Sequence, residues 1–381
     1  MTNRIVLLPG DGVGPEVTAA ARRVMDAAAR RFGIALSVEE HVFGGAAIDE
    51  TGEPFPDATR KACLEADAVF LGAVGGPKWD HAPKRPEQGL LALRKTLGVF
   101  ANLRPVRVLP GMEAYGPLKS ELSRGVDFLI IRELTGGTYF GERVEGRERA
   151  SDETVYTREE VIRVARVAFE AARARNGRLA SVDKANVMAT GRLWRRAVND
   201  LREAEYNDVE LTHVLVDAMA MKLVQAPAAF DVILTENMFG DILSDEASVI
   251  AGSIGLSPSA SLGGRVGLYE PIHGSAPDIA GKDKANPTGA ILSAAMMFRH
   301  SFAAENAAQA IERAVEETLT SGARTADLGG TIGCKAFTEA VVGRIASAIC
   351  DQSGSPSHAP NAAHPGVLRD ATGLAADCSS R

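Results

Sequence analysis

The stretch from Phe230 to Ala251 places a short buried strand directly before a helix that carries acidic side chains. Its apolar run, Val232 to Leu234, is typical of a buried strand, and the residues that follow have a helical pattern. Asp241 and Asp245 are four residues apart, so on a helix both carboxylates project from one face. Two like charges at this spacing repel each other by roughly a few tenths of a kcal/mol unless a cation lies between them.

The chemistry of these donors suits a hard divalent cation. Carboxylate oxygens are the ligands that Mg²⁺ and Mn²⁺ prefer, whereas zinc usually takes nitrogen and sulfur. Asp217, which ends another apolar run, could bring a third carboxylate to Asp241 and Asp245. The alternative interpretation is an ordinary solvated acidic helix face, which is common at this spacing.

Length and composition indicate a soluble globular protein with room for two domains. The chain has 381 residues, of which 45% are hydrophobic and 24% are charged. Its net charge of -7 argues against a nucleic-acid surface, which needs a basic patch. The cysteines at positions 63, 334, 350 and 378 are widely spaced, as in proteins with reduced thiols. Because no apolar segment suits a signal peptide or a membrane span, we expect a cytoplasmic protein.

The chain begins as α/β proteins do, with a strand, a glycine turn and a helix. Arg4 to Leu8 is predicted as a strand and Glu16 to Arg31 as an amphipathic helix. The glycines between them, at positions 10, 12 and 14, give GxGxG in place of the GxGxxG of a pyrophosphate-binding turn. A Rossmann fingerprint is therefore excluded here.

Strands and helices alternate along the rest of the chain. We predict strands at 35–43, 68–74, 179–187 and 209–216, and helices at 57–66, 89–97, 157–175, 189–205, 288–300, 305–320 and 338–350. The helix from Thr157 has a capping box with Glu160. The segment from Tyr139 to Tyr156 has strand-like residues among charges and is a candidate arm for pairing with another subunit. Residues 351–381 have the composition of a disordered tail.

Three arginines lie at the edges of apolar elements. They are Arg94, Arg104 and Arg132. Each alone is more often a surface residue, but together they suit a substrate with carboxylates, which guanidinium groups bind bidentately. Leu90 and Leu91 lie beside Arg94, so an apolar group and an anion could be recognised together.

Two further segments hold polar residues without an obvious structural purpose. Lys184 and Asn186 lie at the end of the strand predicted at 179–187, where a lysine is usually only solvated. The region 269–290 forms one long irregular loop, and a loop of this length in a compact domain is usually functional.

Seven sequence blocks occur in the order found in one known family: PGDGVGPEV, PEQGLLALR, ANLRP, RELTGGTYFG, DKANV, TENMFGDILSDE and HGSAPDIAGKDKANP. On these blocks the chain, from Met1 to Cys350, resembles the metal-dependent β-decarboxylating dehydrogenases, which include isocitrate, isopropylmalate, homoisocitrate and tartrate dehydrogenases. The resemblance implies a two-domain α/β fold, with a mainly parallel sheet flanked by helices, that is not a Rossmann fold. It implies a discontinuous cofactor-binding domain of residues 1–99 and 252–350. Residues 100–251 would form a central domain with the metal site and the dimer interface.

The resemblance also implies roles for individual residues. Lys184 resembles the base that takes the substrate's hydroxyl proton, and Tyr139 the acid that protonates the enolate carbon. The implied metal ligands are Asp217, Asp241 and Asp245. The implied substrate-binding residues are Leu90, Leu91, Arg94, Arg104, Arg132 and Asp217. The implied cofactor-binding residues are Gly75, Gly76, Glu87, Asn186, His273, Gly274, Ser275, Ala276, Asp278 and Asn286. In the family Lys184 and Asp217 come from the neighbouring subunit, so a homodimer would be the smallest active unit.

Two of these residue sets bear on specificity. Burying an isopropyl group against Leu90 and Leu91 is worth about 2 kcal/mol, whereas burying an unpaired carboxylate there would cost more. Asp278 resembles the family's ribose-binding position, where a carboxylate would repel a 2′-phosphate and favour NAD over NADP. We therefore expect NAD-dependent oxidative decarboxylation of 3-isopropylmalate, with Mg²⁺ or Mn²⁺, in leucine biosynthesis.

Two alternatives stay open at this point. A malate or tartrate dehydrogenase of the same family would keep the metal site, Lys184 and Tyr139 and would differ in the apolar pocket. A non-catalytic anion-binding relative would use the arginines alone. Lys184 and Tyr139 argue against the second alternative, because binding needs neither.

Overall fold

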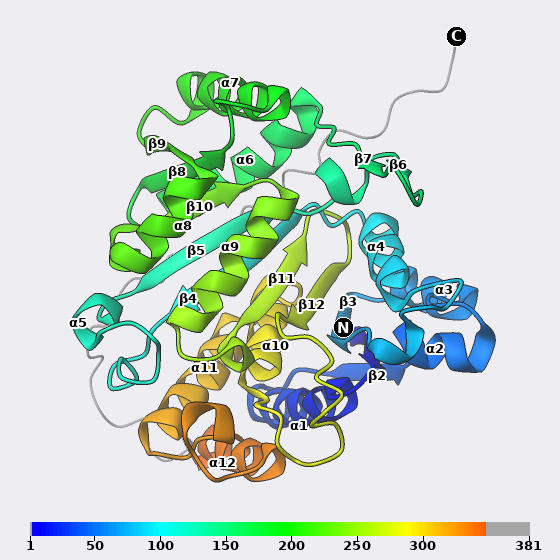
Figure 1. The fold of residues 1–381 in the computed structure, drawn as a ribbon. Helices are drawn as coiled ribbons and strands as arrows, with labels where there is room; N and C mark the ends of the chain where they lie inside the picture. Colours follow the sequence, from blue (N-terminus) through cyan, green and yellow to red (C-terminus); the bar gives the residue numbers. More distant parts are fainter. Residues whose placement is uncertain (1, 348–381) are drawn as a thin grey trace.

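In the computed structural model, which describes residues 2–347, one ten-stranded sheet runs through the whole molecule (Figure 1). Its strand order is β2-β1-β3-β12-β11-β4-β5-β10-β8-β9. The strands are β1 (Asn3–Gly10), β2 (Leu36–Glu40), β3 (Ala68–Ala73), β4 (Ala101–Arg107), β5 (Asp127–Glu133), β8 (Arg178–Asp183), β9 (Glu210–Leu215), β10 (Val232–Thr235), β11 (Pro258–Leu262) and β12 (Gly267–Pro271). Neighbouring strands are parallel except at β12–β11, β11–β4 and β4–β5. The predicted mainly parallel α/β sheet is confirmed.

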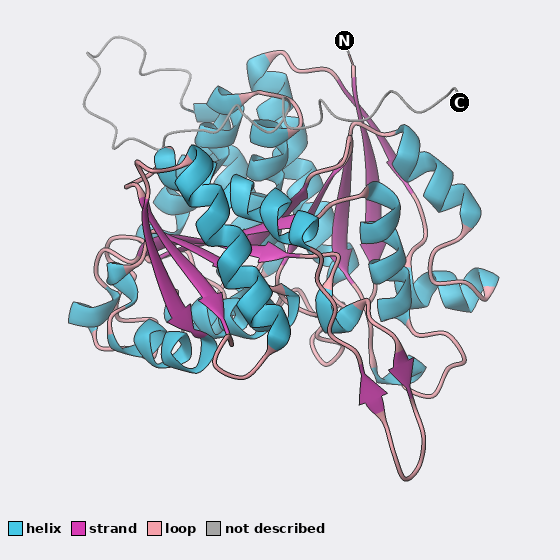
Figure 2. Cartoon of the chain, turned by 90° about the horizontal axis from the view of Figure 1, so that it is seen from above, coloured by secondary structure: helices cyan, strands magenta, loops and turns pink. Residues whose placement is uncertain are grey.

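The sheet joins two groups of strands that come from different parts of the sequence. Residues before 74 and after 257 supply β2, β1, β3, β12 and β11, and residues 101–235 supply the other five strands. The groups meet where β11 pairs with β4 and Ala260 lies opposite Leu103. Figure 2 shows the strands spreading apart on either side of this junction.

Helices cover both faces of the sheet. They are α1 (Gly14–Phe32), α2 (Gly44–Thr51), α3 (Asp57–Glu65), α4 (Pro86–Leu97), α5 (Ser120–Ser123), α6 (Arg158–Arg173), α7 (Ala189–Glu205), α8 (Val216–Gln225), α9 (Asn237–Ile250), α10 (Thr288–His300), α11 (Glu305–Thr320) and α12 (Cys334–Ser347). In Figure 1, α8 and α9 lie in front of β4, β5 and β10, while α10 and α11 lie behind the sheet. None of the helices in residues 2–347 combines the length and apolar character needed to cross a membrane.

Several predicted elements are confirmed closely. The helices α7, α10 and α11 have the predicted bounds. The capping box of α6 forms, because Glu160 N donates to Thr157 Oγ1 (3.2 Å) while Thr157 N donates to the Glu160 carboxylate (2.8 Å). Other predictions were wrong in detail, since β8 ends at Asp183 and leaves Lys184 just beyond the strand. Asp217 lies in the first turn of α8, a helix that was not predicted, and does not end a strand. The helix predicted at 338–350 begins at Cys334.

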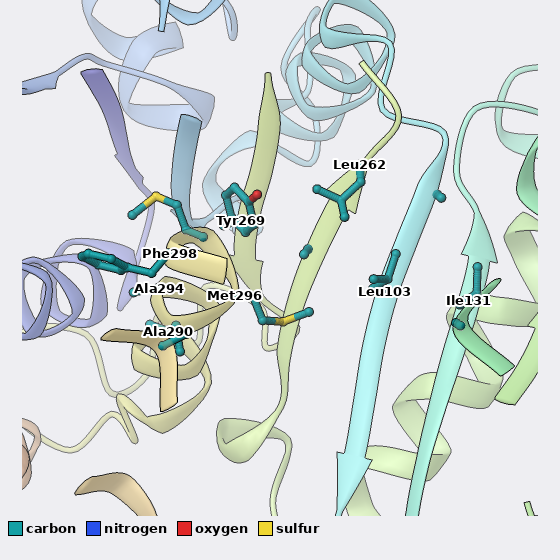
Figure 3. Close-up of a cluster of buried hydrophobic side chains, with 14 of the residues drawn as sticks. Leu103, Ile131, Leu262, Tyr269, Ala290, Ala294, Met296 and Phe298 are labelled. Atoms are coloured by element: carbon teal, nitrogen blue, oxygen red, sulfur yellow. The ribbon is translucent and has the colours of Figure 1, made fainter. Parts of the chain in front are cut away.

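A core of small and apolar side chains joins α10 to the sheet. Figure 3 shows Met296 of α10 reaching toward the strands, with Leu103 of β4 and Ile131 of β5 on that side, while Ala294 and Phe298 lie on the other side of α10. All five side chains are buried. Because side chains alternate along a strand, the residues next to Leu103 and Ile131 point to the opposite face of the sheet. That alternation places Arg104 and Arg132 under α9.

The segment predicted as an arm is a projecting hairpin. Its strands, β6 (Arg143–Val144) and β7 (Ser151–Asp152), pair only with each other in the described residues. Figure 2 shows the hairpin extending away from the rest of the molecule, and residues 142–153 are exposed. Its pairing with another subunit stays a prediction. The predicted tail, 351–381, lies outside the described residues.

Candidate active site

The centre of the site is a set of charges between the sheet and α9. Arg104 on β4 and Arg132 on β5 are 5% and 1% exposed, and buried guanidinium groups need partners. The partners come from α9, where Asp241 and Asp245 project from one face, as predicted.

An arginine occupies the position between the two aspartates. Arg104 Nη2 lies 3.7 Å from Asp241 Oδ1, and Arg104 Nη1 lies 3.5 Å from Asp245 Oδ1. Arg132 pairs with Asp241 through Nη1, while its Nε and Nη2 donate to Asn237 Oδ1 at 3.0 and 2.8 Å. These contacts disfavour the interpretation of α9 as an ordinary solvated acidic face.

The two carboxylates differ in their electrostatic surroundings. Burial raises the pKa of Asp245 above its ordinary value. Burial acts on Asp241 in the same direction, but the charges of Arg132 and Arg104 outweigh it and hold the pKa of Asp241 below its ordinary value. Within residues 2–347 the Asp245 carboxylate accepts no hydrogen bond. The oxygens of Asp245 are therefore available to a further cation, and the all-oxygen donor set fits Mg²⁺ or Mn²⁺.

Tyr139 lies beside this cluster, on the short 3₁₀ helix η2 (Gly137–Tyr139). Its hydroxyl donates to Asp241 Oδ2 at 2.9 Å, and the Arg132 guanidinium lies 5.7 Å from the centre of its ring. Burial and the Asp241 carboxylate raise the pKa of Tyr139 to about 12. The phenol therefore keeps its proton at neutral pH and can act as a proton donor.

The third predicted arginine reaches the same site from α4. Arg94 is buried, and its Nη2 donates to Glu270 Oε1 on β12 at 3.0 Å. The charge of Arg94 contributes to the pKa shifts of both Arg104 and Asp241, so the three arginines share one electrostatic environment. Leu90 and Leu91 are half-buried on the same helix.

Lys184 and Asp217 form a separate pair. Lys184 Nζ lies 2.6 Å from Asp217 Oδ1, and this hydrogen bond lowers the pKa of Asp217. In the described part of one chain, no hydrogen bond or ion pair joins either residue to Asp241 or Asp245. Nor do three side chains of His, Cys, Asp or Glu gather as a metal site within residues 2–347. One chain therefore does not bring the three predicted metal ligands together.

The predicted cofactor loop rests on the glycine turn after β1. Val13 N donates to Ser275 O at 2.7 Å, and a Cβ on Gly12 would lie 1.9 Å from that oxygen, so only glycine fits there. Ala276 has φ 38°, a left-handed conformation that is strained for alanine and typical of binding loops. Gly274 and Asp278 are exposed.

Other predicted cofactor residues differ in their surroundings. Asn286 is buried, and its Nδ2 donates to Asp327 Oδ2 at 2.9 Å. Burial lowers the pKa of His273, whose Nε2 is buried without a partner among the described residues. Asn186 is exposed and makes no hydrogen bond to the loop 273–287 within residues 2–347.

A buried carboxylate that sequence reasoning missed links the loops of this region. Asp11 accepts hydrogen bonds from Gly45 N (2.9 Å), Ala46 N (2.8 Å) and Gly75 N (2.8 Å). Burial, its largest influence, raises the pKa of Asp11. The acid inside the turn PGDG was the available signal. Gly75 in turn lies against Glu87, whose Oε1 would be 2.6 Å from a Cβ at position 75.

A large cavity lies on the other face of the sheet. It has a volume of about 1270 Å³, and its strand residues include Leu103, Pro105 and Leu129. These residues alternate with Arg104 and Arg132 along β4 and β5, so this cavity is separate from the charged site.

Known proteins share both the sequence and the fold. The family model for isocitrate/isopropylmalate dehydrogenase matches residues 4–341. A 3-isopropylmalate dehydrogenase of Anaeromyxobacter dehalogenans is 56% identical over 91% of this chain and 100% of its own length. One from Gloeobacter violaceus is 55% identical over 88% of this chain and 96% of its own length. Among solved structures, isocitrate dehydrogenase from Methylococcus capsulatus superposes with a TM-score of 0.81 at 34% identity, over 90% of this chain and 99% of that one.

Proposed function

Because the chain belongs to the isocitrate/isopropylmalate dehydrogenase family, we propose that it catalyses the NAD-dependent oxidative decarboxylation of (2R,3S)-3-isopropylmalate. The products are 4-methyl-2-oxopentanoate and CO₂, and the reaction is a step of leucine biosynthesis. The observation that carries the proposal is the convergence of Arg132, Tyr139 and Asp241 in one contact set.

The substrate's two carboxylates are bound by the arginines. Arg94, Arg104 and Arg132 are held by Glu270, Asn102 and Asn237, so their guanidinium groups have fixed orientations before substrate arrives. A preorganised cation loses little freedom when it binds an anion. Leu90 and Leu91 on the same helix as Arg94 then receive the isopropyl group.

Two side chains of the protein move protons. Lys184 of the partner subunit takes the hydroxyl proton as hydride passes to the nicotinamide. Tyr139 gives its proton to the carbon that has lost CO₂, and its pKa of about 12 fits a group that is protonated until that step. Asp241, Asp245 and Asp217 of the partner subunit would hold Mg²⁺ or Mn²⁺, which stabilises the negative charge that develops on the substrate oxygens.

A homodimer is supported by apolar side chains on α8 and α9. Met221 and Val224 of α8 are 58% and 45% exposed, and Ile242 and Val249 of α9 are 60% and 49% exposed. Large apolar side chains that gather on neighbouring helices are typical of an interface. Asp217 begins α8, so a partner packed on this surface lies beside the Lys184–Asp217 pair.

The cofactor, the domains and the location complete the proposal. NAD binds along the loop 273–287, with Asp278 at the ribose.

Residues 1–99 and 252–350 form the cofactor-binding domain and residues 100–251 form the central domain. The two groups of strands in the sheet support this division. The free, buried thiols of Cys63 and Cys334 suit a reducing cytoplasm.

One assay tests the proposed substrate. NADH formation is measured with 3-isopropylmalate, D-malate, tartrate and isocitrate in the presence of Mg²⁺ or Mn²⁺. The highest kcat/KM is expected for 3-isopropylmalate. A higher value for D-malate or tartrate would replace the proposal with the corresponding activity, and no turnover of any of the four would overturn it.

A further inference from the structure

Three buried polar side chains lie next to the loop that carries Tyr139 and have no role in the mechanism above. They are Glu133 at the end of β5 (0% exposed), Tyr156 just before α6 (6%) and Glu236 at the N-cap of α9 (8%). The Tyr156 hydroxyl lies 3.3 Å from Glu133 Oε2 and 3.3 Å from Glu236 Oε2. Buried carboxylates are costly, so this arrangement needs a physical reason.

Glu133 holds the loop that carries Tyr139. Its Oε1 accepts hydrogen bonds from Thr135 N (3.0 Å) and Thr135 Oγ1 (2.9 Å), and its Oε2 accepts one from Gly136 N (2.8 Å). Tyr139 follows only three residues after Gly136. The carboxylate therefore fixes the backbone at the point where the chain leaves β5 and turns toward the site.

Tyr156 ties this loop to the start of α9. Its ring lies so close to Gly136 and Gly137 that a Cβ on either glycine would be 2.6 Å from a Tyr156 atom. Its hydroxyl accepts a hydrogen bond from Asn237 N (3.0 Å), and Asn237 Nδ2 donates to Gly136 O (3.0 Å). One hydroxyl thus connects the two elements whose side chains, Tyr139 and Asp241, share the hydrogen bond of 2.9 Å.

A count of protons decides how the two carboxyl groups share Tyr156. A phenol has one proton to donate, and Tyr156 shares it between Glu133 Oε2 and Glu236 Oε2, each at 3.3 Å. Glu133 also accepts three hydrogen bonds from its loop and has Arg163 Nη2 at 3.4 Å.

Glu236 reaches the same hydroxyl from the start of α9. Its Oε1 accepts a hydrogen bond from Phe239 N (2.8 Å), and its Oε2 accepts from Met238 N (3.3 Å) and from the Tyr156 hydroxyl (3.3 Å). Burial raises the pKa of Glu236, while the hydrogen bonds from Phe239 N, Met238 N and the Tyr156 hydroxyl act in the opposite direction. Glu236 therefore ties Tyr156 to the first turn of α9.

We propose that Tyr156 and Glu133 are positioning residues that hold Tyr139 against Asp241, with Glu236 as the second acceptor of the Tyr156 hydroxyl. This inference rests on the proposed role of Tyr139 as the acid. It predicts that side chains outside the substrate site control one proton transfer.

Single substitutions test the hydrogen-bond assignment. Tyr156→Phe keeps the ring but loses the hydroxyl, and Glu133→Gln turns an amide N–H toward the N–H of Thr135 or Gly136. Both are expected to lower kcat by roughly 10- to 100-fold, the effect of a small misplacement in an active site, with KM changed much less. Glu236→Gln keeps an oxygen that can accept from Tyr156 and lies on α9, outside the loop that carries Tyr139, so it is expected to lower kcat less than Glu133→Gln does. A loss of kcat with Glu236→Gln larger than that with Glu133→Gln would overturn the assignment of Glu133 as the group that fixes this loop.

A matched control separates positioning from simple stability. Tyr206 is also buried, and its hydroxyl donates to Glu170 Oε1 on α6 at 2.7 Å; within residues 2–347 neither residue hydrogen-bonds to Glu133, Tyr139 or Glu236. Tyr206→Phe is expected to lower the thermal midpoint without lowering kcat. A loss of kcat as large as that of Tyr156→Phe would show that any lost tyrosine hydroxyl has this effect, and would overturn the inference.

A double-mutant cycle decides whether Tyr156 acts through Tyr139. In a Tyr139→Phe background, Tyr156→Phe is expected to have no further effect on kcat, because the group that it positions is already gone. The same fold-decrease in kcat in both backgrounds would overturn the inference. The cycle does not use Glu133→Gln, so it remains a test even if that variant does not fold.

Wild-type turnover of 3-isopropylmalate is measured first, because its absence would overturn the proposed function. In an active enzyme, equal effects of Tyr156→Phe in both backgrounds would overturn only the positioning role.

Discussion

The ammonium of Lys184 lies 2.6 Å from the carboxylate of Asp217, while the hydroxyl of Tyr139 donates to Asp241 in a separate cluster. The proposed base and the proposed acid of one reaction thus lie in different places in one chain. Asp217 is 61% exposed, so a second subunit has access to the pair. A site completed across a dimer interface reconciles this separation with the chemistry.

Mixed dimers test that arrangement. Lys184→Ala and Arg94→Ala chains, each inactive alone, are unfolded and refolded together. If Lys184 acts across the interface, one site of each mixed dimer has an intact lysine and an intact arginine, and the other site has both lesions. Activity is expected to return to roughly a quarter of the wild-type value for random pairing.

The control for this experiment is mass measurement of the refolded species. Mixed dimers that are present but as inactive as their parents would show that Lys184 serves its own chain. Neither homodimer can supply the recovered activity, because each has a lesion in both of its sites.

Removal of the divalent cation is expected to abolish turnover. Asp241→Asn and Asp245→Asn should each weaken Mn²⁺ binding at least roughly tenfold, the cost typical even of changes around a metal's ligands. The measurement is the rise in thermal midpoint with added Mn²⁺, which reports binding without any need for activity. Full activity in EDTA-treated protein would contradict the metal site.

The cofactor preference is expected to depend on Asp278. Asp278→Ser removes a charge opposed to a 2′-phosphate and should narrow the kcat/KM ratio of NAD to NADP by about fivefold. Asp57→Asn, a fully exposed carboxylate on α3, is the matched control and should leave the ratio unchanged. An unaltered ratio in the Asp278 variant would exclude this position from ribose recognition.

The stability of the metal-free protein should depend on pH through Asp241. Its pKa lies below the ordinary value of 3.8, because Arg132 and Arg104 outweigh burial. A depressed carboxyl pKa contributes stability that is present above pH 4 and is lost as pH falls through the folded-state value. The gap in unfolding free energy between wild type and Asp241→Asn should therefore narrow on acidification, as urea titrations at pH 7 and pH 3 would measure. A gap that widens at pH 3 would contradict the assigned shift.

The elements that the sequence predicted best have clear signals at both ends. In α7, apolar residues recur with a clear helical period. In α6, the capping box of Thr157 and Glu160 marks where the helix begins. Helix α8 was missed because β9 passes into it at Val216 with no glycine or proline between them. Strand β11 was missed because its residues, PSASL, are small and polar and gain their burial from long-range pairing.

The site was predictable in composition but not in its internal pairing. The three arginines and the two aspartates of α9 were identified as candidate groups, yet their spacing in the sequence does not reveal that Arg104 lies between Asp241 and Asp245. Glu270 pairs with Arg94 across a separation of 176 positions, so only the folded sheet brings them together. The hydrogen-bond partners of Tyr156 could not be predicted from the sequence either, because they lie at the end of β5 and the start of α9 and only the fold brings them to Tyr156.

The strand order has a consequence for synthesis on the ribosome. Strand β3 emerges early, but its neighbour β12 (Gly267–Pro271), on the side toward the centre of the sheet, is translated long after it. The strands β4, β5, β8, β9 and β10 all lie within residues 101–235 and pair with one another, and only β4 also pairs with a later strand, β11. We expect the middle of the nascent chain to become protease-resistant first. The edge of β3 that will pair with β12 should stay unpaired, and so accessible to chaperones, until β12 has been translated. Limited proteolysis of stalled nascent chains would show the order, and early protection of the β1–β3 segment would refute it.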